Sequence, residues 1–212
     1  KGATSTTEYT EGTWHHLLVT RNGTTVTLYF DNSAEGTSTN SENFNNTTYV
    51  PTIGAYTGNN SVSNFTGKIA QMRIYKGKGF SASEVQQNFD AMKGRYVSSP
   101  LIISGSFGDE NIITSDLVLN LDANNYTSGT TWTDTSGQSN DGTLTNGITY
   151  SSENGGVLVL NGTSDYITTG SDMFNANSNF TFSMWFNSDD FSEQKAFCAD
   201  VDNSQCLFLR YN

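Results

Sequence analysis

Residues 12–32 read GTWHHLLVTRNGTTVTLYFDN, and this stretch decides the fold of the chain. Asn22-Gly23 separates two runs rich in β-branched, aromatic and aliphatic residues, a pattern typical of a β-hairpin with a type I′ turn. Strand residues alternate between two faces. One face is predicted to carry Trp14, Leu18, Val26, Leu28 and Phe30, and the other Arg21, Thr25, Thr27 and Asp31. A hairpin with one apolar face needs a second sheet to cover it.

The composition also favours an all-β protein. Of the 212 residues, 34% are hydrophobic, 12% are aromatic and only two are proline. This combination fits short strands around an aromatic core, joined by polar loops. The net charge of −11 argues against nucleic acid as a partner. The sequence contains no run of about 18 apolar residues, so no membrane-spanning helix is predicted.

The charge is unevenly distributed. Residues 1–95 contain eight Lys/Arg and seven Asp/Glu, whereas residues 96–212 contain two and fourteen. Three interpretations remain open: a solvated acidic surface, a cation site in the second half, or two halves that attract each other.

Local patterns predict further elements. Residues 64–75 and 179–187 alternate as strands, and shorter strands are expected at 49–55, 116–122, 156–162, 165–167, 195–199 and 205–211. Residues 33–48 and 124–140 are predicted to be loops. One helix is expected over 82–93, because Ser81 and Glu84 form a capping-box pattern and Gly94 follows.

These motifs together resemble a laminin G-like domain of the concanavalin A-like lectin/glucanase group. The chain is similar to the pentraxin-like subgroup of that group, and it also resembles such modules in structural proteins of marine phages. The resemblance rests on these segments: 12–16, 22–31, 65–75, 81–89, 117–122, 134–142, 158–167 and 180–186. The resemblance implies a two-sheet antiparallel jelly-roll sandwich with one short helix.

The segments stand in an unusual order. The second half of such a domain corresponds to residues 1–95 and the first half to 116–212, with 96–115 as a linker. The chain could be a shifted slice of a repeat array, a circular permutant that closes on itself, or a subunit whose halves complete neighbouring copies. In each version, a lone half would expose apolar surface and strand edges.

No catalytic pattern is found, so the protein is predicted not to be an enzyme. Glycan-cleaving enzymes need two carboxylates that flank the bond, and the Glu-x-Asp-x-x-Glu spacing of the glucanases is absent. Asp189 and Asp190 are adjacent, as are His15 and His16, so each pair would point to opposite faces of a strand. The histidines are therefore expected to pack or hydrogen-bond rather than chelate one metal.

Calcium is the best-motivated cofactor. Calcium prefers carboxylate, amide and backbone oxygens on loops, and the candidate ligands are Asp134, Ser136, Asn140, Asp141, Asp165 and Asp122. The alternative is a polar turn in which Asp and Asn side chains cap their own backbone.

Aromatic residues beside polar loops are candidates for sugar stacking. They are Trp132, Tyr126, Tyr56, Tyr150 and Tyr49. The alternative is that they simply anchor their loops. Cys198 and Cys206 flank a polar hairpin loop, so a disulfide and two free thiols both remain open.

We therefore expect a non-enzymatic adhesion or structural module on a virion or cell surface, outside the cell, with a glycan or host surface as partner. One alternative is a self-assembling fibre or shell subunit that binds other copies of itself. Another is a carbohydrate-binding appendage of a glycan-degrading enzyme.

Overall fold

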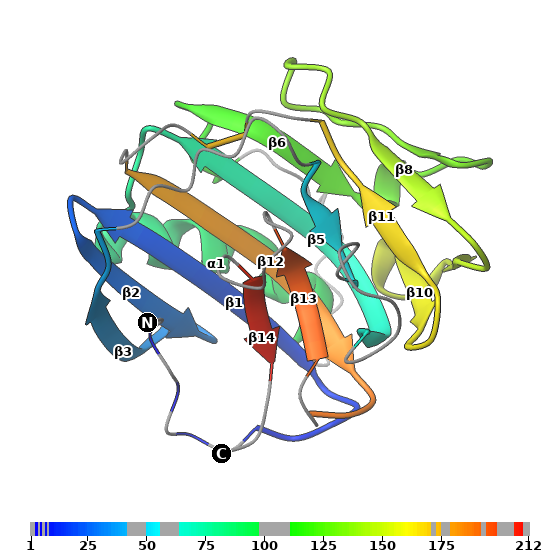
Figure 1. Cartoon of the computed structure of the whole chain (residues 1–212), viewed down its shortest axis with the longest axis horizontal. Coiled ribbons are helices and arrows are strands. Elements are labelled where there is room, and N and C mark those ends of the chain that lie inside the picture. The colour runs from blue at the N-terminus through cyan, green and yellow to red at the C-terminus, as the bar shows by residue number, and fades with distance from the viewer. Residues whose placement is uncertain are drawn as a thin grey trace.

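Two antiparallel β-sheets face each other, and a helix covers the outer side of the larger sheet (Figure 1). This computed structural model describes residues 3, 5, 7, 9–41, 50–55, 64–97, 111–170, 173–174, 179–191, 194–198 and 206–209. Of these, residues 194–196, 198 and 206–209 are described by their backbone alone.

Eight of the described strands form the larger sheet. Their order is β3 (Ser33–Thr39), β2 (Thr25–Phe30), β1 (Trp14–Asn22), β12 (Phe180–Ser188), β5 (Thr66–Lys76), β10 (Val157–Asn161) and β9 (Thr149–Ser151), and β6 (Leu117–Asp122) also pairs with β5. The smaller sheet has the order β14 (Cys206–Leu209), β13 (Gln194–Cys198), β4 (Thr52–Ile53), β11 (Tyr166–Thr168), β8 (Gly142–Thr145) and β7 (Thr131–Trp132). The predicted two-sheet, all-β sandwich is confirmed.

Each sheet combines strands from the two halves of the chain. In the larger sheet β12 lies between β1 and β5, and in the smaller sheet β4 lies between β13 and β11. The opening hairpin therefore pairs with a strand from the second half of the same chain.

The opening hairpin forms, but its predicted turn and faces are wrong. Asn22 pairs with Thr25, so the loop is Gly23-Thr24, and Gly23 alone has a positive φ, +60°. This is the type II′ pattern rather than type I′.

The β1 residues that share a face with Leu28 and Phe30 are Val19 and Leu17, their direct partners. Trp14 and Leu18 face the helix instead. Because β1 is buried on both faces, its apolar residues do not reveal which face meets the second sheet.

Helix α1 (Ala82–Tyr96) begins at the predicted capping box, with both reciprocal hydrogen bonds between Ser81 and Glu84 present. It extends beyond the predicted end at Lys93 because Tyr96 stacks on Trp185, with ring centroids 4.5 Å apart. The predicted loops at 33–48 and 124–140 are wrong in part, because β3 and β7 lie within them, and β8 and β9 were not predicted. These strands are short or polar, and β3 and β9 end the strand order of the larger sheet.

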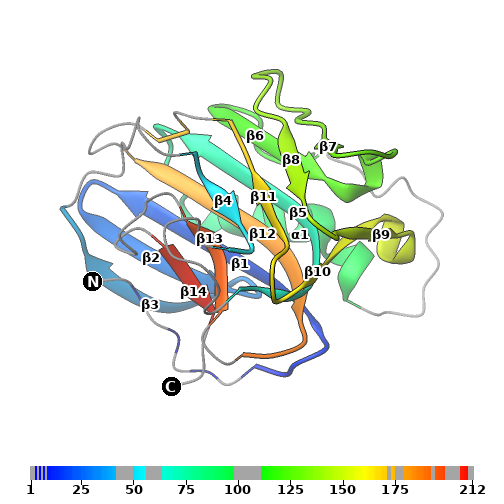
Figure 2. The ribbon, with the colours of Figure 1, turned by 45° about the vertical axis from the view of Figure 1, so that its right-hand side comes forward.

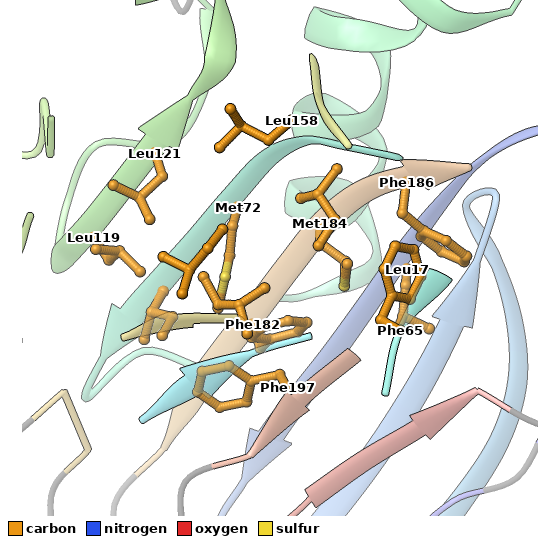
Figure 3. Close-up of a cluster of buried hydrophobic side chains, with 14 of the residues drawn as sticks. Leu17, Phe65, Met72, Leu119, Leu121, Leu158, Phe182, Met184, Phe186 and Phe197 are labelled. Carbon is orange, nitrogen blue, oxygen red and sulfur yellow. The ribbon is translucent and has the colours of Figure 1, made fainter. Parts of the chain in front are cut away.

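The main core fills the space between the sheets (Figure 3). Leu17, Met72 and Met184 from the larger sheet and Phe197 from the smaller sheet point into it. A second buried layer lies between the larger sheet and α1 and includes Trp185 and Val85. No helix in the described part of the chain is long and apolar enough to cross a bilayer.

Candidate ligand-binding surface

The predicted calcium loop folds around Asp134. Its Oδ1 accepts hydrogen bonds from the backbone N–H groups of Asn120 and Ser136, at 2.8 and 2.9 Å. Its Oδ2 accepts from the Ser136 hydroxyl at 2.7 Å and from the Asn140 N–H at 2.9 Å. Asp141 Oδ1 in turn accepts from the Asp134 N–H at 2.8 Å. This geometry is that of an Asp-centred polar turn.

The two remaining calcium candidates lie elsewhere. Asp165 is buried and accepts from the N–H groups of Gly147 and Asn161, at 2.9 and 3.1 Å. Asp122 forms an ion pair with Arg95, 2.6 Å between Nη1 and Oδ2. The Asp165 carboxylate is therefore bound by backbone N–H groups and the Asp122 carboxylate by an arginine, and neither belongs to the Asp134 loop.

In this arrangement the six residues do not form a calcium site with free oxygen ligands. Both oxygens of Asp134 already accept two hydrogen bonds, which occupies the lone pairs that calcium would use. Among the described residues, no three His, Cys, Asp or Glu side chains cluster closely enough to hold a metal. Calcium binding stays a prediction that titration can test.

Two of the predicted aromatic residues meet at the surface. The rings of Tyr126 and Tyr150 lie 5.4 Å apart between centroids, at an interplanar angle of 36°. Tyr150 is 43% exposed, and the Tyr126 hydroxyl donates to the Gly129 carbonyl at 2.7 Å, which fixes the orientation of that ring. We call this pair the tyrosine platform. Tyr150 belongs to β9, which lies at one end of the larger sheet, whereas β2 and β3 lie at the other end (Figure 2).

Trp132 is not part of this surface, and its prediction as a sugar-stacking residue is wrong. Its side chain is completely buried in the main core. Burying the large indole ring in the core stabilises the folded protein more than leaving it exposed beside a polar loop would. Tyr49 and Tyr56 lie outside the described residues.

A buried ion pair positions the tyrosine platform. Asp122 uses Oδ2 for Arg95 and Oδ1 to cap the N–H of Asn124, at 2.8 Å. Asn124 belongs to the 3₁₀ helix η2 (Ala123–Asn125), which directly precedes Tyr126. The predicted metal ligand Asp122 thus organises the turn that carries one platform ring.

The same arginine reaches the segment that follows Tyr150. Arg95 Nε donates to the carbonyl of Asn154, at 3.1 Å, in the 3₁₀ helix η3 (Glu153–Gly155). The adjacent Gly156 has a φ of +127°, and a Cβ atom there would lie 2.4 Å from the Ala123 carbonyl. Arg95 and Gly156 therefore hold the two platform segments together, and no local sequence signal identified them.

His15 forms a hydrogen-bonded chain on the inner face of β1. Its Nδ1 lies 2.7 Å from Asp31 Oδ2 and its Nε2 lies 2.7 Å from the Thr13 hydroxyl. The order of groups is that of a carboxylate, imidazole and hydroxyl triad. However, the Thr13 hydroxyl donates to the Thr10 carbonyl at 2.6 Å, so its proton is directed away from the imidazole. The chain fastens residues 10–13 to the turn after β2.

His16 lies on the opposite face of β1, as predicted. Its ring packs against Trp185 and against Phe89 of α1, and its Nε2 lies 3.0 Å from the Ser183 hydroxyl. Burial is the main reason that the pKa of His16 is lowered to about 3; the charge of Asp31 partly opposes this shift, and that of Arg73 adds to it. The imidazole is thus neutral near pH 7.

A comparison with protein families finds one family model that matches the first part of the chain. Residues 1–86 match the family model Laminin_G_3, described as the concanavalin A-like lectin/glucanases superfamily. The matched part is similar to laminin G-like domains. It contains the opening hairpin, β5 and the first turn of α1. Searches for curated proteins and for solved structures returned no match. The pentraxin-like subgroup, the phage relationship and the permuted order stay predictions.

Proposed function

We propose that this protein is a non-catalytic carbohydrate-binding module that contacts its ligand with the tyrosine platform. The observation that carries the proposal is the contact between the two tyrosine rings at an exposed sheet edge. Sugar rings present C–H faces that pack on aromatic rings and hydroxyl rims that need hydrogen-bonding partners.

The surroundings of the platform supply both kinds of contact. Tyr150 gives an exposed aromatic ring, and Asn124 and Asn125 are exposed on the adjoining turn. Amide groups can both donate to and accept from sugar hydroxyls. The hydrogen bond of the Tyr126 hydroxyl and the packing of η2 keep the surface ordered before a ligand arrives, which lowers the entropic cost of binding.

Binding of soluble oligosaccharides tests the proposal. A glycan array would first select ligands, and calorimetry would then compare the wild type with Tyr150→Ala. We expect the variant to lose about fivefold or more in affinity, because an exposed stacking partner is removed. Val97→Ala is the matched control, because Val97 is another exposed apolar side chain, at 52% exposure, and lies outside the platform. Equal affinity of wild type and Tyr150→Ala for every ligand found would reject the platform as the site.

We further propose that one chain forms a complete sandwich by closing on itself, rather than by exchanging halves with neighbouring copies. The pairing of β12 between β1 and β5 within one chain supports this version. Light scattering at micromolar concentration should then give the mass of a monomer. An obligate oligomer that unfolds on dilution would favour complementation between copies instead. A place on a virion or cell surface remains a separate prediction.

A further inference from the structure

We infer that Cys198 and Cys206 form a disulfide that closes the hairpin of β13 and β14. The backbone register pairs these two residues directly with each other, in an antiparallel arrangement. The neighbouring pair, Phe197 with Leu207, continues the same register. This inference is independent of carbohydrate binding.

The register satisfies the distance that a disulfide requires. Directly opposite residues in antiparallel strands have Cα atoms about 4.5 Å apart in non-hydrogen-bonded pairs and about 5.5 Å apart in hydrogen-bonded pairs. Disulfides join Cα atoms about 4.4–6.8 Å apart. Both kinds of pair are therefore compatible with a disulfide between Cys198 and Cys206.

The position gives such a bond a structural role. β14 ends the strand order of the smaller sheet, and β13 joins that sheet through β4, which has only two residues. Phe197, in contrast, is buried in the main core and packs against Phe182, with centroids 4.9 Å apart. A covalent bond beside Phe197 would hold the edge strand to the anchored strand and restrict the unfolded chain.

The oxidation can be written with a disulfide compound as oxidant, here oxidised glutathione. The thiolate of one cysteine attacks the glutathione disulfide and forms a mixed disulfide, releasing one glutathione. The second cysteine thiolate displaces the other glutathione. The protein loses two protons and two electrons, and two molecules of reduced glutathione form. A bond that persists in the native protein places the protein in an oxidising environment, such as the outside of a cell.

Mass spectrometry of the full chain tests this inference. The chain is refolded in a mixture of oxidised and reduced glutathione, quenched with acid and measured with and without reduction. The expected unreduced product is a monomer two hydrogen atoms lighter than the reduced one. It should take up no alkylating reagent in denaturant until it is reduced, and a digest should contain the peptide that links Cys198 to Cys206.

A shifted cysteine provides the matched control. In Cys206→Ser/Leu207→Cys, the second thiol moves to the residue that pairs with Phe197, on the other face of the sheet. This variant should not become lighter by two hydrogens as a monomer. The inference is overturned if the refolded wild type keeps two alkylatable thiols, if its disulfides join different molecules, or if the shifted variant oxidises equally well.

Discussion

The two faces of the larger sheet bury their side chains in different ways. On the inner face, Leu17, Met72 and Met184 pack against the smaller sheet and require only apolar neighbours of suitable shape (Figure 3). On the outer face, beneath α1, the buried groups include Arg73 and Asp122, and each depends on a particular hydrogen-bond partner. The inner face should therefore tolerate conservative replacement, and the outer face should be sensitive to the loss of a single partner.

Breaking the ion pair between Arg95 and Asp122 on the outer face should cause the largest loss of stability among these variants. We expect Arg95→Ala to lower the free energy of unfolding by about 3–5 kcal/mol, because it leaves a buried carboxylate without its cation. Urea denaturation at pH 7 measures this change. The double variant Arg95→Met/Asp122→Asn should cost less than Arg95→Ala, because it removes both charges and keeps an acceptor for the Asn124 N–H. A single variant that is as stable as the wild type would contradict the assigned role.

Met184 tests the inner face by the same measurement. Met184→Ala should cost about 2–5 kcal/mol, because its side chain is completely buried in the main core. Met184→Leu should cost less than about 1.5 kcal/mol, because the volume is nearly conserved. If the leucine variant is as unstable as the alanine variant, the inner face also depends on a specific side chain and the contrast between the faces fails.

The sequence predicted well those features that depend on neighbouring residues. The capping box at Ser81 and the central strand β12 are local patterns, and both formed as predicted. The face assignment of β1 failed because both of its faces are buried. On the outer face, His16 and Ser183 are 167 residues apart, so no local pattern could pair them.

At the candidate site, too, local sequence patterns could not predict contacts between distant segments. Tyr126 and Tyr150 were identified separately as loop aromatics, but their contact depends on η2 and η3 being held together by Arg95. Trp132 has equally polar sequence neighbours, yet it is completely buried. Composition around an aromatic residue therefore predicts a loop, whereas exposure depends on the tertiary packing.

The outer face should also make stability depend on pH through His16. Its pKa is lowered from 6.5 in the unfolded chain to about 3 in the folded protein, mainly by burial. Between these values the unfolded state binds the extra proton, so stability falls as the pH falls below 6.5. At pH 5 this group alone should cost about 2 kcal/mol relative to pH 8.

His16→Gln isolates that contribution, because glutamine does not titrate and its amide can still form a hydrogen bond with the Ser183 hydroxyl. Urea denaturation from pH 5 to 8 should show a smaller loss of stability in this variant than in the wild type. The lowered pKa values of Glu84, Asp90 and Glu35 affect both proteins equally and cancel in the difference. Parallel stability curves would show that His16 is not buried as a neutral imidazole.

The smallest expected effect concerns the cap of the helix that covers the outer face. Ser81→Ala removes the side-chain acceptor for the Glu84 N–H and should cost about 1 kcal/mol. Ser81→Thr is a matched control and should cost less, because its hydroxyl can still accept from the Glu84 N–H. Neither variant changes the burial of His16 in the folded state, so both should keep the pH dependence of the wild type. A Ser81→Ala variant with a weaker pH dependence would mean that α1 separates from the sheet before the rest of the sandwich unfolds.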